Sequence, residues 1–315
     1  MNCIEFNAKQ SAEYLKNNDN FLILTHQSPD GDTLGSGYGL CRALRKLGKK
    51  ANVVCPDEIS NKFAYLILEN EDFIPETFVA VDLADTKLLG KLASEYADKI
   101  DLCIDHHYSN VKYAKRLYLG DNAAACECVF EVIEELGVKF DKDIANAIYT
   151  GIATDTGCFK FSNTSPNTHR VAAKMMEFGA DYATINKVMF DTKTKGRLEL
   201  ERQVLENIKY YFGGKCAAIV VTKEMLEKTG VDPFELDSIT AIPRTIEGVV
   251  AGITVKEKDD GVFKVSLRTY EPLDAAKICK KYGGGGHLAA AGCSFNCSPD
   301  EILQKLTEEI GKELL

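Results

Sequence analysis

The sequence contains no apolar stretch that approaches the roughly eighteen residues that a membrane-spanning helix needs. Its first ten residues, MNCIEFNAKQ, lack the basic region and the apolar core of a secretory signal peptide. It also shows no internal repeat and no low-complexity segment. We therefore expect a cytoplasmic protein with no membrane partner. At 315 residues, the chain is long enough for two domains with cores of their own.

Cysteine pairs and basic runs are missing as well. None of the eleven cysteines makes a CxxC pair, so we interpret them as reduced, mostly buried thiols rather than disulfides or zinc ligands. No Lys/Arg-rich run is present, and the formal net charge is −9. Proteins that grip long duplexes usually carry a basic surface. The acidic balance therefore favours a small or short ligand and argues against long duplex nucleic acid.

Strand-like and helical patterns alternate through the first part of the chain. The strand-like segments are 21–24, 51–55, 78–83 and 101–105. The helical segments are 8–17, 35–48, 86–97, 123–137, 142–154 and 167–179. This alternation predicts an α/β domain over residues 1–190, built on a doubly wound, mainly parallel sheet.

The rest of the chain predicts a second, smaller α/β domain over residues 213–315. Residues 191–212 are charged and helical, and we interpret them as a helical connector. Strand patterns and helices then follow at 215–222, 248–256, 262–269, 273–282 and 299–313. The turn Asp259-Asp260-Gly261 predicts that the last two strands form a hairpin.

Residues 21–37, FLILTHQSPDGDTLGSG, gather polar side chains where a predicted strand gives way to a helix. The strand pattern stops at Thr25-His26, a Pro/Gly-rich turn presents Asp30 and Asp32, and Gly35-Ser36-Gly37 is expected to open the helix. In open α/β sheets, ligands bind in the crevice at the carboxyl ends of the strands. The stretch therefore predicts a ligand site.

Three further segments bring acids and imidazoles to the ends of predicted elements. They contain Asp82, Asp105-His106-His107 and Asp155. A lone aspartate after a strand is most often a turn residue, but its recurrence at one sheet edge favours a shared site. Four carboxylates about 4 Å apart would repel by roughly 4 kcal/mol per pair at an effective dielectric near 20. Either their pKa values rise or divalent cations neutralise them.

Mixed imidazole and carboxylate ligands suit Mn²⁺ better than Mg²⁺ or Ca²⁺, with Zn²⁺, Co²⁺ and Fe²⁺ left open. A pair of such ions activates water and steadies charge on a phosphoryl group. Phosphoester hydrolysis is therefore the reaction class that this cluster favours.

A run of four glycines precedes His287 near the end of the chain. Because four glycines cost too much backbone entropy inside an ordinary strand or helix, we predict a loop that approaches a ligand closely. With Arg268 on the predicted hairpin, the loop would form a phosphate or nucleotide clamp. A flexible surface loop is the alternative. The residues expected to bind substrate are Arg268, Gly284, Gly285, Gly286 and His287.

Together these segments resemble the DHH phosphoesterase superfamily, in the subgroup that carries a C-terminal DHHA1 domain. The motifs are THQSPDGDTLGS (25–36), VAVDLAD (79–85), Asp105-His106-His107, GIATDTGCF (151–159) and GGGGHLAAAG (283–292). They stand in family order and cover nearly the whole chain. Within the family, the sequence is most similar to the nanoRNase (oligoribonuclease) / pAp phosphatase group.

The resemblance implies a role for each residue of the site. One metal ion would be held by His26, Asp30 and Asp82, and the other by Asp32, Asp82, His106 and Asp155. Asp82 would bridge the two ions, with the attacking water opposite it. His107 would contact the substrate phosphate and help with proton transfer, and Asp105 would orient a neighbouring group.

The resemblance also implies a Mn²⁺-dependent enzyme that hydrolyses short oligoribonucleotides (nanoRNA) and 3′-phosphoadenosine 5′-phosphate (pAp) in a cleft between the domains. The nearest alternative is a cyclic-di-AMP or pApA phosphodiesterase of the same family. A family II pyrophosphatase would lack the glycine-rich segment, and a RecJ-like exonuclease would be larger and more basic. A non-catalytic nucleotide-binding regulator would require a broken ligand set, whereas all six positions are filled. Direction of degradation and a homodimeric state are left open.

Overall fold

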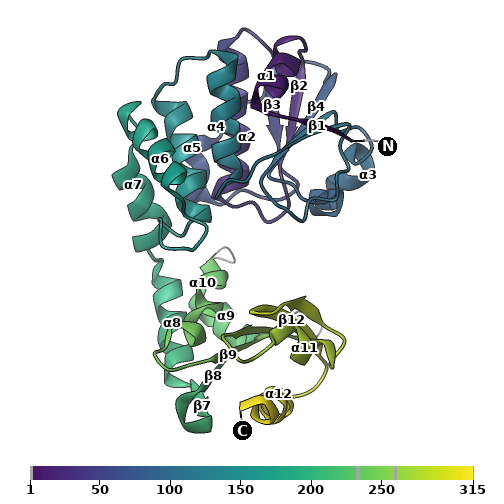
Figure 1. Ribbon diagram of the computed structural model, residues 1–315. Coiled ribbons are helices and arrows are strands. Elements are labelled where there is room, and N and C mark those ends of the chain that lie inside the picture. The colour runs from purple at the N-terminus through teal and green to yellow at the C-terminus, as the bar shows by residue number, and fades with distance from the viewer. Residues whose placement is uncertain (1–2, 232–234, 259–260, 315) are drawn as a thin grey trace. The chain divides into compact units, whose positions relative to one another are not determined.

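A computed structural model describes residues 3–231, 235–258 and 261–314 of the chain (Figure 1). The chain divides into two compact units, the first ending at Thr192 and the second beginning at Lys193. In the described residues, no helix is both long and apolar enough to span a bilayer.

The first unit is built on a six-stranded parallel sheet in the order β1-β6-β5-β4-β2-β3. Its strands are β1 Ile4–Phe6, β2 Phe21–Leu24, β3 Ala51–Val54, β4 Thr77–Val81, β5 Leu102–Asp105 and β6 Arg116–Leu119. Strand β3 lies on one side of β2, and the next strand in sequence, β4, lies on the other side of β2. The order therefore reverses between β2 and β4, which is where open α/β sheets bind their ligands. The predicted α/β class with a doubly wound sheet is confirmed.

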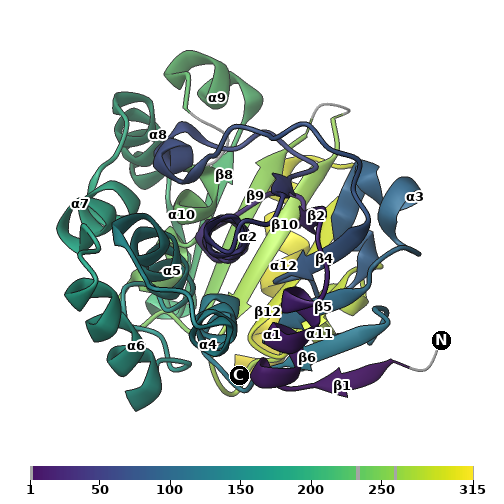
Figure 2. The same cartoon turned by 90° about the horizontal axis from the view of Figure 1, so that it is seen from above.

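Helices cover both faces of this sheet (Figure 2). They are α1 Ala8–Lys16, α2 Gly31–Lys46, η1 Asn61–Leu66, η2 Thr86–Leu92, α3 Ala93–Tyr96, α4 Ala125–Leu136, α5 Lys142–Asp155, α6 Pro166–Glu177, α7 Tyr182–Asn186 and the π-helical η3 Lys187–Asp191. Alternate residues of β2 enter different clusters. Phe21 and Ile23 pack with α1, α2, α4 and α5, whereas Leu22 and Leu24 pack against Leu89 of η2. Burial on both faces explains the unbroken apolar run.

Helix α2 begins at Gly31, four residues before the start expected from Gly35-Ser36-Gly37. Asp30 is the N-cap: its Oδ1 accepts hydrogen bonds from the backbone amides of Asp32 and Thr33. The glycines serve close packing. A Cβ on Gly35 would lie only 2.3 Å from the carbonyl oxygen of Ala147 on α5. The expectation that the helix opens at Gly35 was therefore wrong, and Asp32 lies in the first helical turn.

The second unit contains a mixed six-stranded sheet in the order β11-β12-β10-β9-β8-β7. Its elements are α8 Lys195–Glu206, β7 Lys209–Tyr211, η4 Phe212–Gly214, β8 Cys216–Val221, α9 Lys223–Thr229, α10 Leu236–Thr240, η6 Ile242–Thr245, β9 Ala251–Glu257, β10 Phe263–Thr269, α11 Ala275–Lys280, β11 Gly285–His287, β12 Ala290–Phe295 and α12 Pro299–Leu314. Strands β9 and β10 pair antiparallel, as the predicted hairpin requires. Its turn residues Asp259 and Asp260 lie outside the described residues.

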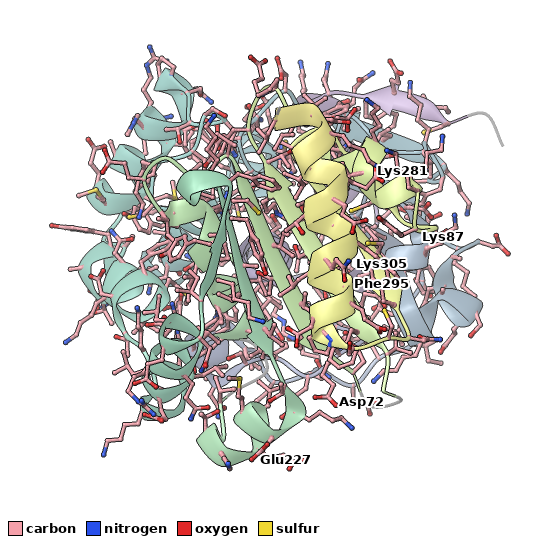
Figure 3. All side chains as sticks on the ribbon, turned by 90° about the horizontal axis from the view of Figure 1, so that it is seen from below. Asp72, Lys87, Glu227, Lys281, Phe295 and Lys305 are labelled. Carbon is pink, nitrogen blue, oxygen red and sulfur yellow. The ribbon has the colours of Figure 1, made fainter. Side chains whose placement is uncertain are left out.

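Helix α12 covers one face of the second sheet (Figure 3). Its apolar residues Ile302, Leu306 and Ile310 are fully buried there. At its side, the ammonium of Lys305 lies 5.9 Å from the centroid of the Phe295 ring on β12, and Figure 3 labels both residues. An amphipathic helix thus closes a core separate from that of the first unit.

The segment expected to be a helical connector forms α8 and β7. Leu200 and Val204 of α8 are fully buried against Ile219 and Val221 of β8. Helix α8 therefore packs within the second unit. The division into residues 1–190, 191–212 and 213–315 stays a prediction.

The glycine run is only partly a loop, because Gly285–His287 form the edge strand β11, paired with β12. A Cβ on Gly284 would lie 2.1 Å from the carbonyl oxygen of Gly292, and one on Gly286 would lie 2.4 Å from that of Ala290. The expectation that these glycines could not form a strand was wrong. They let the backbone lie against β12, where a side chain would collide.

All eleven cysteines are free thiols, and seven of them are buried. Burial raises the pKa of Cys41, of Cys128 and of Cys216. The predicted burial of most thiols is therefore confirmed, and the buried ones act as small apolar side chains. Their reduced state stays a prediction.

Candidate metal centre

Three parallel strands deliver the candidate ligands to one edge of the first sheet. His26 stands two residues after β2, Asp82 directly after β4, and His106 directly after β5. Because these strands are parallel neighbours, their carboxyl ends meet at the point where the strand order reverses. The sheet thus brings together residues that are far apart in the sequence.

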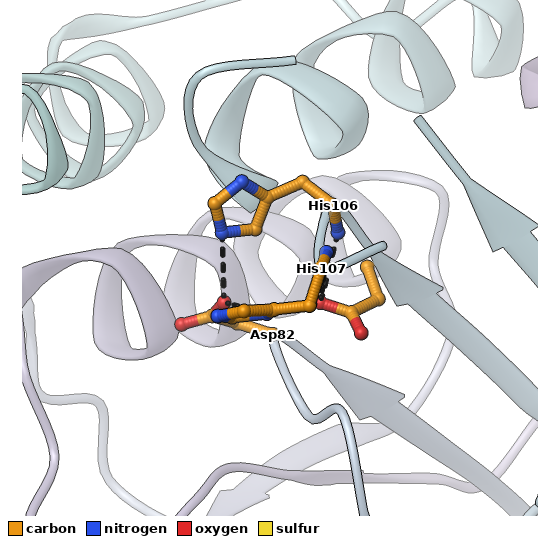
Figure 4. A group of neighbouring side chains, drawn as sticks. Asp82, His106 and His107 are labelled. Atoms are coloured by element: carbon orange, nitrogen blue, oxygen red, sulfur yellow. Dashed lines mark hydrogen bonds and ion pairs between the residues drawn. The ribbon is translucent and has the colours of Figure 1, made fainter. Parts of the chain in front are cut away.

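Asp82 lies at the centre of the cluster, with its side chain only 3% exposed. Its Oδ2 lies 3.4 Å from Nε2 of His26, and its Oδ1 lies 3.5 Å from Nε2 of His106. Figure 4 shows the carboxylate of Asp82 beside the rings of His106 and His107. Asp82 also has a φ of 53°, in the left-handed region that few residues other than glycine adopt. Such strain is typical of functional sites.

Main-chain carbonyls fix the orientation of the imidazole rings of His26 and His106. Nδ1 of His26 lies 2.8 Å from the carbonyl oxygen of Gln27, and Nδ1 of His106 lies 3.1 Å from that of Asn122. Since a carbonyl only accepts, each Nδ1 carries the proton that it donates. Nε2 of each ring then faces the carboxylates and is the atom that would bind a metal ion.

The carboxylate of Asp32 is held by the first turn of α4. Its Oδ2 accepts a 2.6 Å hydrogen bond from the amide of Ala125, and its Oδ1 accepts one of 2.9 Å from Cys126. Helix N-termini favour negative charge in this way. Oδ2 of Asp32 also lies 3.8 Å from Nε2 of His106. Asp155 is the last residue of α5, and its Oδ2 lies 3.8 Å from the same Nε2 of His106.

Asp105 is fully committed to hydrogen bonds. Its Oδ1 lies 2.8 Å from Nδ1 of His107 and accepts from the amides of His106 and His107, while its Oδ2 accepts from Asn110. The side chain is completely buried. The hydrogen bond to Asp105 raises the pKa of His107. Asp105 therefore positions His107, and both of its oxygens already accept hydrogen bonds.

The electrostatics of the cluster favour cations. Burial lowers the pKa of His26, but neighbouring carboxylates outweigh burial and raise it to about 11. The same balance raises the pKa of His106 to about 10. Burial raises the pKa of Asp155 to about 6 and, with the neighbouring charge of Asp82, also raises that of Asp32. Burial opposes the ionisation of Asp82, yet the two imidazoles lower its pKa.

Three sets of side chains have donor atoms close enough to hold an ion: His26 with Asp30 and Asp82; Asp32 with His106 and Asp155; and Asp82 with Asp105, His106 and His107. In the third set, Asp105 and His107 already bond to each other, so we take the first two as the candidate ion sites. Within each set, the ligand atoms lie within 4.8 Å of one another. Donors about 2.0–2.2 Å from an ion in tetrahedral geometry are roughly 3.4 Å apart, and the imidazole–carboxylate separations here begin at that value. Oδ1 of Asp82 is buried and finds no hydrogen-bond partner among the described residues, which is costly unless a cation meets it. The residues present therefore fit divalent cations.

The predicted substrate residues Arg268 and His287 belong to the second unit. On β10, Arg268 pairs with Ala290 of β12, and His287 of β11 pairs with Ala290 from the other side. Directly paired residues point to the same face of a sheet. Arg268 and His287 therefore lie on one face, two strands apart.

Sequence reasoning missed the groups that support the ligands. The carbonyls of Gln27 and Asn122 and the amides of Ala125 and Cys126 belong to the main chain, so no residue type marks them. One signal was available: a helix is predicted to begin at residue 123, and a helix N-terminus is where a buried carboxylate finds donors.

Family models match both units. Residues 20–152 match the DHH family, N-terminal domain, and residues 213–313 match the DHHA1 domain. A bifunctional oligoribonuclease and PAP phosphatase, NrnA, from Thermus thermophilus is 33% identical over 302 residues, which cover 93% of this chain and 89% of the relative. The protein of the same name from Bacillus subtilis is 28% identical over 305 residues, with 94% and 96% covered.

Solved structures share the fold. An exopolyphosphatase-related protein from Bacteroides fragilis has a TM-score of 0.84 at 24% identity, covering 97% of this chain and 95% of that chain. A structure of exonuclease RecJ bound to manganese has a TM-score of 0.54 at 15% identity, covering 96% and 93%.

Proposed function

The chain belongs to the DHH family and carries a DHHA1 domain, and from this premise we propose that it is a two-metal phosphoesterase acting on short oligoribonucleotides and on pAp. The family resemblance expected from the motifs is thereby confirmed. Its relatives are named for oligoribonuclease and PAP phosphatase activities, and the match covers nearly their whole length. The chain is a hydrolase of phosphoester bonds.

One observation supports the two-metal reading above all: the two oxygens of Asp82 face different imidazoles. His26 and Asp30 would complete one ligand set, and Asp32, His106 and Asp155 the other. Divalent ions at such a centre supply a nucleophile at neutral pH and neutralise charge on the phosphoryl oxygens. The groups that hydrogen-bond to the ligand side chains, among them the amides of Ala125 and Cys126 that hold Asp32, keep the donors in place for that task.

His107 is suited to proton transfer. Because Asp105 holds the proton on Nδ1, Nε2 of His107 is the atom that takes or gives a proton at the substrate. The side chain of His107 is 43% exposed, so substrate can reach it. We assign His107 to contact with the phosphate, Asp105 to holding its tautomer, and Asp82 to holding the metals.

Arg268 and His287 are assigned to the phosphate and the terminal nucleotide, together with Gly284, Gly285 and Gly286. Their position on one face of the second sheet supports this assignment. An arginine fork binds phosphate oxygens in pairs. His287 is exposed at the edge strand β11.

Mn²⁺ is our proposed ion, because it accepts both imidazole and carboxylate ligands. A cytoplasmic location is retained as a prediction.

A substrate panel tests this function. Purified protein with Mn²⁺ is given pAp, a di-adenylate and cyclic-di-AMP in parallel, and product release is followed by chromatography. We expect turnover of pAp and of the di-adenylate. Hydrolysis of the cyclic dinucleotide alone would instead favour the alternative phosphodiesterase of the same family.

A further inference from the structure

A cavity of about 420 Å³ adjoins the metal centre on the first unit. Its lining includes His106 and His107, which the proposed function places at the metals and the phosphate. The loop after β5 contributes Tyr108, and the end of β6 and the loop after it contribute Leu119 and Asp121. The volume falls within the range of small-molecule sites, about 300–1,000 Å³.

The apolar part of the wall comes from two exposed side chains. Tyr108 is 91% exposed and Leu119 is 37% exposed. Exposed apolar residues that are scattered singly need no explanation. These two line the same cavity, and Tyr108 directly follows the histidine that we assign to the phosphate.

The polar part of the wall disfavours a second phosphate group. Asp121 contributes a carboxylate, and the cavity has no lysine or arginine among its lining residues in the described chain. Asn163 is fixed in place, because its Nδ2 donates hydrogen bonds of 3.1 Å to the carbonyl oxygens of Ala123 and Asp155. An uncharged, flat group with hydrogen-bond donors therefore fits better than an anion.

We propose that this cavity is a nucleobase subsite in which Tyr108 stacks on the base of the nucleotide whose phosphate lies at His107. The inference rests on the proposed function and extends it by naming how the first unit holds the nucleoside. Leu119 supplies the second apolar wall. Stacking tolerates every base, which suits a hydrolase of mixed short oligoribonucleotides.

Kinetics on base-bearing and base-free substrates test the subsite. The Tyr108→Ala variant should lower kcat/KM for pAp by about fivefold to a hundredfold, as the loss of one base–aromatic stack implies. It should leave kcat/KM unchanged for the abasic analogue, 1-deoxyribose 3,5-bisphosphate, and Tyr108→Phe should behave as wild type. The matched control is Tyr210→Ala, which removes an exposed tyrosine from β7 in the second unit. An equal loss on both substrates, or no loss on pAp, would overturn the subsite.

A binding measurement separates the subsite from catalysis. The chain contains no tryptophan, so Tyr108→Trp introduces a single fluorophore at the cavity. AMP should quench its emission saturably, whereas ribose 5-phosphate should not, and Tyr210→Trp should respond to neither. Quenching without any turnover of pAp or oligonucleotides would refute the proposed function and leave the subsite standing. No quenching by AMP, or equal quenching by ribose 5-phosphate, would refute the subsite.

Discussion

Asp105 Oδ1 lies 2.8 Å from Nδ1 of His107 and holds that ring through a completely buried carboxylate. The remaining oxygen of Asp105 accepts a 2.7 Å hydrogen bond from Asn110. Every interaction of Asp105 thus serves to position the loop and the ring. In a centre rich in carboxylates, this one acts on the imidazole and leaves the metal donors to its neighbours.

Replacing Asp105 by asparagine should separate proton transfer from metal binding. Both carboxylate oxygens accept hydrogen bonds from N–H donors, so an amide nitrogen in either position would face a donor and the ring would be held less firmly. The variant also loses the negative charge that raises the pKa of His107. We expect kcat to fall by about 10²–10⁴-fold, the range for a positioned general acid or base. The metal content measured on the purified variant should stay that of the wild type.

The control is Asp101→Asn, which changes an aspartate just before β5, at the opposite end of that strand. It pairs with Lys115 away from the cluster, so kcat should not change. Loss of bound metal in Asp105→Asn would contradict the assignment of Asp105 as a positioning residue.

Arg268→Lys tests the phosphate assignment in the second unit. Lysine keeps the charge but loses the planar fork that binds two oxygens. KM for pAp should rise by about tenfold while the metal content is unchanged. Lys264→Ala changes a cation four residues earlier on β10, and its KM should match that of the wild type. An unchanged KM in Arg268→Lys would argue against a bidentate phosphate contact.

Gly35→Ala should destabilise the first unit. The new Cβ would meet the carbonyl oxygen of Ala147 at 2.3 Å and the thiol sulfur of Cys126 at 2.9 Å, and overpacking of this kind costs about 1–3 kcal/mol. In Gly39→Ala, one turn later, the nearest contact of the new Cβ is the flexible tip of Ile148 at 3.1 Å, and the Cβ of Ala147 lies at 3.6 Å, an ordinary van der Waals distance. We expect a lower melting temperature for Gly35→Ala and little change for Gly39→Ala. Equal melting temperatures for the two variants would contradict the packing of α2 on α5.

Glu127→Gln should change how stability depends on pH. The Glu127 carboxyl on α4 is fully buried, accepts hydrogen bonds from Thr168 and Asn167, and has a pKa that burial raises. Its ionised form therefore costs stability above the folded pKa. That cost disappears as the pH falls through the folded pKa toward the unfolded value near 4.3.

The glutamine variant removes this titration. The melting temperature of Glu127→Gln minus that of the wild type should therefore decrease as the pH is lowered from 8 to 4. For each unit by which folding raises the pKa of Glu127, the free energy of unfolding of the wild type is about 1.4 kcal/mol lower above the folded pKa than it is at low pH. A difference that is constant over this range, or that grows on acidification, would contradict the raised pKa.

Much of the fold followed from apolar patterns. The runs that became β2, β4 and β5 are buried on both faces, so they stand out as continuous apolar segments. Strands β1, β7 and β11 are three residues long and lie at or near sheet edges. Patterns so short carry no clear period, and β11 is rich in glycine, which propensity assigns to loops.

The candidate ligands were predictable because their residue types are distinctive and follow apolar runs. Their supports were not. Asp32 is held by the amides of Ala125 and Cys126, more than ninety residues away in sequence, and tertiary packing alone brings these groups together. The start of α2 was missed for a similar reason, because the contact of Gly35 with α5 outweighs the low helix propensity of glycine.

The metal stoichiometry of the wild type and of two variants at Asp82 tests the central claim most directly. Asparagine tolerates the left-handed backbone at this position, so Asp82→Asn should fold, and Asp82→Ala removes the bridging carboxylate altogether. After equilibrium dialysis against Mn²⁺, we expect two ions per wild-type chain. Each variant should lose at least one ion, and turnover of pAp should be abolished. Wild-type turnover in either variant, or full wild-type activity with fewer than two ions bound, would contradict the two-metal account.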